Sequence, residues 1–106
     1  MWVFTVTGFY SIIVDRHNPD HLLVRSRVAG DIEALWPSAK VEQTPTRDYN
    51  YTYRASIPRH IVMQAISSEI EDIDYDNYRH AIHDLRRLFD YTIIWQQLAR
   101  MGQALT

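Results

Sequence analysis

The sequence predicts an α+β fold. We expect a four-stranded, mainly antiparallel sheet, with strands mostly within residues 1–56 and helices at about 28–36, 58–73 and 76–101 packed on one face. Two observations support this. Apolar and polar residues alternate with a period of two as far as residue 56, and a helical period follows. The 106 residues are 46% hydrophobic and 23% charged, which indicates a single globular domain, residues 1–106.

The first three strands are separated by two turns. Residues 2–7 and 9–14 flank Gly8, which we expect to adopt positive φ in a tight hairpin. Residues 18–20, Asn-Pro-Asp, mark the second turn, because proline fixes φ and Asx side chains bond to the backbone. Residues 21–27 form the third strand.

A short helix and a fourth strand follow. Residues 28–36 have apolar side chains at helical spacing, and Pro37 ends the helix. Residues 38–48 are a mostly polar connection. Tyrosines alternate with polar residues over 49–56, which predicts the fourth strand.

The remainder is predicted to be helical. Pro58 suits a first helical turn, and an apolar stripe follows at Val62, Ala65, Ile66, Ile70 and Ile73. We expect a break at residues 73–77, where Asp and Asn side chains compete for backbone hydrogen bonds. The final helix, residues 85–101, has one apolar side formed by Leu88, Tyr91, Trp95, Leu98 and Met101.

Several short motifs occur together over most of the chain: Met1-Trp2-x-Phe4-Thr5, Gly8-Phe9-x-Ser11, Leu23-Val24-Arg25-x-Arg27, Asp48-Tyr49-x-Tyr51, Ile57-Pro58-Arg59, Ile73-Asp74-Tyr75-x-Asn77-Tyr78 and Trp95. With these motifs the chain resembles a family of small, single-domain, uncharacterised bacterial proteins. The resemblance implies one bacterial, cytoplasmic domain and carries no activity to transfer. The chain departs from the family pattern near residues 79–84, where a longer polar linker is expected.

The composition argues against several functions. Cysteine is absent, so disulfides and Cys-bound zinc are excluded. The longest apolar run is residues 1–4, too short to span a bilayer. Three glycines cannot build a phosphate-binding loop or a dinucleotide fingerprint, and no nucleophile elbow occurs. We therefore expect a cytoplasmic protein with no enzymatic activity, no catalytic residues, no cofactor and no membrane partner.

The best candidate for a metal site lies just before the final helix. On one continuous helix, Asp76, His80 and His83 or Asp84 would share a face, and imidazole with carboxylate suits zinc or another divalent ion. Side chains at this spacing also form ordinary surface hydrogen bonds and ion pairs, and no distant third ligand can be named. We therefore expect no bound metal, with His80 and His83 as weak candidates.

One predicted sheet face is rich in arginine. If Leu22, Val24, Tyr51 and Tyr53 point inward, the outer face carries Arg25, Arg27, Thr52 and Arg54. Arginine beside aromatic rings on an open sheet is typical of modules that bind single-stranded nucleic acid. A solvated polar face is the simpler interpretation. The net charge of −2 also argues against bulk attraction to nucleic acid.

The strongest anomaly is acidic. Five of the eight residues from 69 to 76 are acidic and none is basic: Glu69, Glu71, Asp72, Asp74 and Asp76, referred to below as the acidic run. Such a patch could guide a basic partner, although a solvated helix end would have the same composition. Tyr75 and Tyr78 lie within or beside the run, and tyrosine commonly anchors interfaces.

We therefore predict a non-enzymatic protein-interaction domain that binds another protein through the acidic run with Tyr75 and Tyr78. Regulators, antitoxin-like partners and inhibitors carried by phages or mobile elements share this profile, and homo-oligomerisation is compatible with it. The alternative is a single-stranded nucleic-acid-binding module that uses Arg25, Arg27 and Arg54.

Overall fold

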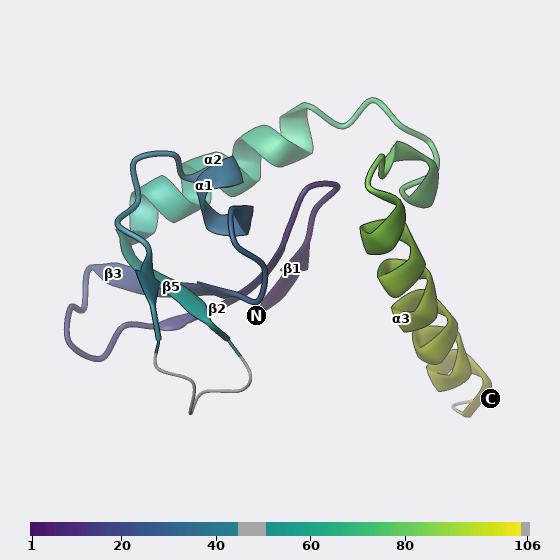
Figure 1. Ribbon diagram of the computed structural model, residues 1–106, viewed down its shortest axis with the longest axis horizontal. Helices are drawn as coiled ribbons and strands as arrows, with labels where there is room; N and C mark the ends of the chain where they lie inside the picture. Colours follow the sequence, from purple (N-terminus) through teal and green to yellow (C-terminus); the bar gives the residue numbers. More distant parts are fainter. Residues whose placement is uncertain (45–50, 105–106) are drawn as a thin grey trace. The chain divides into compact units, whose positions relative to one another are not determined.

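The computed structural model describes residues 1–44 and 51–104. The chain forms two compact units, Met1–Ile73 and Asp74–Thr106, which are treated separately below. The first contains the sheet with helices α1 and α2, and the second contains a 3-10 turn, η1, and helix α3 (Figure 1). Over the described residues, no helix combines the length and apolarity that a membrane span requires.

The first unit is built on a five-stranded antiparallel sheet. The strands are β1 (Trp2–Phe4), β2 (Phe9–Val14), β3 (His21–Ser26), β4 (Glu42–Gln43) and β5 (Tyr53–Pro58), in the order β1-β2-β3-β5-β4. The α+β class and the antiparallel sheet are confirmed. The predicted count of four strands is wrong, because β4 consists of two polar residues joined to β5 by backbone pairing, which leaves no apolar pattern to detect.

The bounds of three strands differ from those predicted, and for β3 the difference is one residue, because it ends at Ser26. β1 ends at Phe4, and Thr5 begins a turn in which its amide donates to the carbonyl oxygen of Gly8 at 2.8 Å. β5 begins at Tyr53 and continues to Pro58, which also precedes the first residue of α2 (Arg59–Glu71). The predicted start of this strand, Tyr49, lies outside the described residues.

The conformation predicted for Gly8 is wrong, and the reason for a glycine there is spatial. Among the described residues, Gly30 has positive φ, at 91°, just before α1 (Asp31–Leu35). At Gly8, an added Cβ would lie 2.3 Å from Oη of Tyr10. That ring is fully buried, and its hydroxyl donates to the carbonyl oxygen of Asp31 at 2.6 Å. Gly8 is therefore small because the Tyr10 ring occupies the adjacent space.

Helices α1 and α2 pack on one face of the sheet (Figure 1). The core beneath them consists of Tyr10, Ile12, Val24, Ile32, Trp36, Ala55, Ile57 and Val62. The rings of Tyr10 and Trp36 meet edge to face, with centroids 5.3 Å apart. The indole of Trp36 also donates to the carbonyl oxygen of Ile61 at 3.3 Å, which ties the end of α1 to α2.

The apolar stripe predicted on α2 is only partly buried. Val62 is buried, and Ala65 and Ile66 pack against the core. Ile70 and Ile73 are 64% and 50% exposed. The first half of the stripe therefore builds the core, and the second half does not.

The predicted break after α2 is confirmed. The helix ends at Glu71, and Oδ1 of Asn77 accepts hydrogen bonds from the amides of Arg79 and His80. These bonds begin η1 (Arg79–Ala81), so the helix predicted from residue 76 is wrong at its start.

The long helix of the second unit, α3 (Leu85–Ala104), has 20 residues and is about 30 Å long. Oδ1 of Asp84 accepts a hydrogen bond from the amide of Arg87 at 3.0 Å, an N-terminal cap.

Candidate functional site

The acidic run lies at the end of α2 and in the segment that follows it. Glu69 is half-buried, and the other four carboxylates are exposed. Within the described part of the chain, none of these five side-chain carboxylates makes a hydrogen bond or an ion pair. The run spans the boundary between the units, because Glu69, Glu71 and Asp72 belong to the first and Asp74 and Asp76 to the second.

The two tyrosines predicted beside the run pack within the second unit. Tyr75 and Tyr78 are half-buried, with ring centroids 5.8 Å apart. Tyr78 also stacks on Tyr91 of α3 at 6.2 Å with an interplanar angle of 10°. Tyr91 is 9% exposed. These rings therefore hold the segment before η1 against α3.

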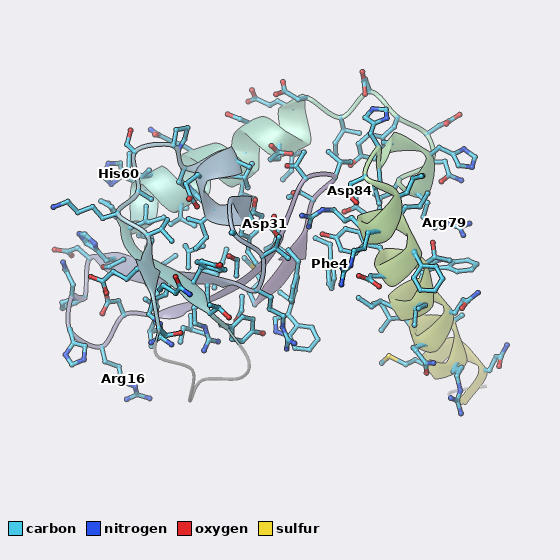
Figure 2. All side chains as sticks on the ribbon, viewed as in Figure 1. Phe4, Arg16, Asp31, His60, Arg79 and Asp84 are labelled. Carbon is cyan, nitrogen blue, oxygen red and sulfur yellow. The ribbon has the colours of Figure 1, made fainter. Side chains whose placement is uncertain are left out.

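Two arginines extend this aromatic group along α3. Nη1 of Arg87 donates to Oη of Tyr91 at 3.1 Å. Arg79, labelled beside α3 in Figure 2, places its Cζ 4.2 Å from the ring centroid of Trp95. Trp95 nevertheless remains 53% exposed. The guanidinium orients this ring without covering it.

The largest exposed apolar surface of the second unit is on α3. Seven of its large apolar side chains are between 37% and 79% exposed: Leu85, Phe89, Ile93, Ile94, Trp95, Leu98 and Met101, referred to below as the exposed α3 residues. The side of α3 predicted to be apolar contains Leu88 and Tyr91 together with Trp95, Leu98 and Met101. In the second unit, Leu88 is half-buried and Tyr91 is buried, whereas those three residues are exposed.

The residues of the predicted metal candidate do not share one helix. Asp76 precedes η1, and His80 belongs to that 3-10 turn. His83 is exposed in the segment after it, and Asp84 caps α3. Over residues 1–44 and 51–104, no group of three or more His, Asp or Glu side chains is placed to hold a metal ion.

The sheet arginines are brought together, as predicted, on the face that α1 and α2 do not cover. Arg25 and Arg54 are direct cross-strand partners, and Nη2 of Arg25 donates to Oγ of Ser11 at 2.7 Å. The guanidinium carbons of Arg25 and Arg27 lie 4.4 Å and 5.2 Å from the ring centroid of Tyr51.

The inward position predicted for Tyr51 is therefore wrong. Tyr51 precedes β5 and is separated from it by a bend at Thr52, so the alternation within the strand does not apply to it. Its ring is 6% exposed and packs with the arginines. Tyr53, the first residue of the strand, does pack against the core.

A polar cluster that was not predicted from the sequence lies at the other end of the sheet. The hydroxyl of Ser56 donates to Oδ2 of Asp15 at 2.5 Å, and Nδ1 of His21 lies 3.0 Å from the same hydroxyl. The hydrogen bond from Ser56 lowers the pKa of Asp15 below its ordinary value of 3.8. The three residues are far apart in the sequence, and the pairing of β3 with β5 brings two of them together.

The geometry of this cluster does not activate a nucleophile. Ser56 has one hydroxyl proton, which it donates to Asp15, so His21 must act as the donor in its own hydrogen bond to Ser56. A nucleophilic serine requires a base that takes its proton. Here the acceptor is a carboxylate with a lowered pKa, which makes it a weak base.

The sheet face and α3 differ in which side chains are accessible. The sheet arginines contact neighbouring side chains, whereas α3 exposes large apolar side chains.

Comparison of the chain with protein-family models, with curated proteins and with solved structures finds no match.

Proposed function

We propose that this chain is a non-enzymatic protein-interaction domain that binds another protein through its second unit. The observation that carries the proposal is the exposure of the seven α3 residues, from 37% for Ile94 to 79% for Leu85. Among the seven, Ile94, Leu98 and Met101 share one side of α3 at i, i+4 and i+7, and Leu85, Phe89 and Ile93 lie on another side at i, i+4 and i+8. Exposed apolar residues grouped in this way, unlike scattered single ones, mark an interaction site. A domain of this kind acts by occupying a surface of its partner, as regulators and inhibitors encoded by phages or mobile elements do.

Trp95 is the proposed anchor of this surface. Tryptophan is enriched among the few residues that dominate binding energy at interfaces. Arg79 contacts the ring at 4.2 Å and restricts its orientation before binding, so less side-chain entropy is lost when the partner arrives. Leu98 lies three positions after Trp95, and Ile94, Leu98 and Met101 lie at i, i+4 and i+7, which is the spacing of an amphipathic helix that docks in a groove.

The acidic run defines the chemistry of the partner. Its carboxylates make no hydrogen bond or ion pair within the described residues, so they are available to cations on another molecule. Asp74 and Asp76 belong to the same unit as α3. We therefore propose a protein partner that has an apolar groove with basic side chains near it. The acidic run accelerates association, and the α3 residues slow dissociation.

The proposal can be tested with a photo-crosslinking amino acid placed on the full chain. The substitution is made at Leu98 on α3 and, as the matched control, at Met63 on α2, because these residues are 55% and 63% exposed. In the native host, we expect one protein of different sequence to be crosslinked from position 98 and not from position 63. An adduct with twice the mass of the chain would instead assign α3 to self-association, and equal yields at both positions would contradict the proposal.

Purified crosslinked partner then allows a quantitative test. Trp95→Ala should weaken its binding by about 2 kcal/mol, mainly through faster dissociation. Trp2→Ala is the matched control, because Trp2 is 67% exposed and lies in the first unit. Replacing the acidic run with Asn and Gln should slow association and reduce its dependence on salt. Unchanged rates in both variants would remove the second unit from the interface.

A second candidate function is supported by the sheet arginines. Arg25, Arg27 and Arg54 lie together, as a phosphate-binding surface requires. Against this, the ring of Tyr51 is 6% exposed and is contacted by two guanidinium groups, so a base cannot stack on it without displacing them. Binding of a single-stranded oligonucleotide that weakens with salt and with Arg25→Ala would support the candidate. No binding at low salt would exclude it.

A further inference from the structure

A cavity of about 700 Å³ lies in the first unit, bounded by α2, the end of β5 and the segment that follows α1. This volume is in the range of small-molecule sites. Its apolar lining includes Trp36 and Ile57, each 3% exposed, together with Ile61 and Ala65. The polar residues at the cavity include Lys40 and Gln64.

Backbone and side-chain hydrogen bonds fix the apolar lining. Trp36 donates through its indole to the carbonyl oxygen of Ile61 at 3.3 Å, so one wall is joined to α2. The carbonyl oxygen of Trp36 accepts a hydrogen bond from the amide of Ala39 at 3.0 Å, which closes the turn just before Lys40. A site whose walls are fixed in this way loses little conformational entropy when a ligand binds.

The charged side chains that line the cavity indicate the sign of the charge that a ligand would carry. Of the described residues that line it, Lys40 is basic and none is acidic. Lys40 is exposed, and it is the only lysine of the chain. Lysine presents a flexible, compact positive charge at the end of an apolar stem. A ligand with an apolar body and one negative end would therefore satisfy both the apolar walls and the charge at the opening.

We propose that this cavity binds a small amphipathic carboxylate, with its hydrocarbon part against Trp36 and Ile57 and its carboxylate near Lys40. The site belongs entirely to the first unit, so it goes beyond the proposed function and does not depend on it.

Three probes that share an eight-carbon tail test the proposal: octanoate, 1-octanol and octylammonium. Each is titrated into the full chain and followed by amide and indole chemical shifts. We expect octanoate to give saturable shifts at Trp36, Ile61 and Ala65 with a dissociation constant on the order of 1 mM. Octylammonium should bind about 3- to 5-fold more weakly, because its charge has the wrong sign.

Two substitutions separate the charge from the cavity. Lys40→Met should weaken octanoate about 3- to 5-fold and leave 1-octanol unchanged, whereas Lys40→Arg should retain the preference for octanoate. Ala65→Phe should obstruct the cavity with a phenyl ring and weaken binding of all three probes. If that variant does not fold, Gln64→Trp obstructs the cavity from an exposed position.

Several results would overturn the proposal. Equal affinity for octanoate and octylammonium would remove the role of Lys40. Shifts confined to α3 would show that the probes bind the exposed apolar helix instead. The absence of saturable shifts, or binding unchanged by the cavity-filling substitution, would show that the cavity is not a ligand site.

Discussion

The first unit buries a continuous core drawn from three strands and both of its helices, whereas the buried apolar residues described in the second unit are Ile82 and Tyr91. The difference is not one of composition, because α3 contains as many large apolar residues as a core helix needs. The two units differ in how much of their apolar side-chain surface is buried. In the first unit apolar surface stabilises the fold, and in the second most of it remains accessible.

The difference also applies to local stability. Opening α3 exposes little additional apolar surface, so its free energy of opening should be lower than that of the sheet. The stacked pair Tyr78 and Tyr91 and the cap at Asp84 are among the interactions that oppose this opening. The proposed role of α3 in binding would benefit from such an arrangement, because its apolar side chains need not first be released from a core.

The largest expected difference in the free energy of unfolding is between alanine substitutions of one tryptophan in each unit. Trp36→Ala should lower the free energy of unfolding by about 3–5 kcal/mol, since it leaves a cavity in the core. Trp95→Ala should cost about 0.5–1 kcal/mol, which is the contribution of an exposed cation–π contact. Urea denaturation followed by far-ultraviolet circular dichroism measures both. Similar losses would contradict the distinction between the units.

An intermediate effect is expected from two glycines. Gly8→Ala should destabilise the first unit by about 1–3 kcal/mol, because the new Cβ meets the buried ring of Tyr10. Gly102→Ala adds a methyl group in open space on α3 and should stabilise that helix by up to about 1 kcal/mol. Hydrogen exchange resolved along the chain reports both changes. Two effects of the same sign would contradict this explanation.

The smallest effect concerns the polar cluster on the sheet. The folded-state pKa of Asp15 is lowered, chiefly by the hydrogen bond from Ser56. The resulting stabilisation is therefore present above the ordinary pKa of 3.8 and is lost as pH falls through the folded-state value. Ser56→Ala should raise the pKa of Asp15, as measured by a carboxyl carbon NMR titration. Ser68→Ala, at an exposed serine on α2, should not change it.

The positions of strands and helices could be predicted where the residue pattern has one physical cause. Alternation placed β2 and β3, and the apolar stripe placed α2, which ends at Glu71, two residues before the expected break. It failed for β4, which exists through pairing with β5 and has no apolar signal. It also failed for Tyr51, whose position depends on a bend at the following residue.

The candidate surface could be predicted only in part. The exposure of most of the acidic run was expected from its charge. Tyr75 and Tyr78 were predicted to face a partner. The ring of Tyr75 packs against Tyr78, and Tyr78 stacks on Tyr91 of α3. Periodicity identified an apolar side of α3 but could not show that it would be exposed, because a packed helix and a binding helix have the same pattern.

The edges of the sheet influence how this chain can associate. Over the described residues, the edge strands β1 and β4 are three and two residues long, shorter than the strands between them. Short edges offer few backbone groups on which another strand could be added, so growth of the sheet into fibrils is disfavoured. The proposed association through the side chains of α3 adds no strand to the sheet. The apolar surface exposed on α3 is therefore a surface of side chains and not an open strand edge, so the proposed binding would not extend the sheet.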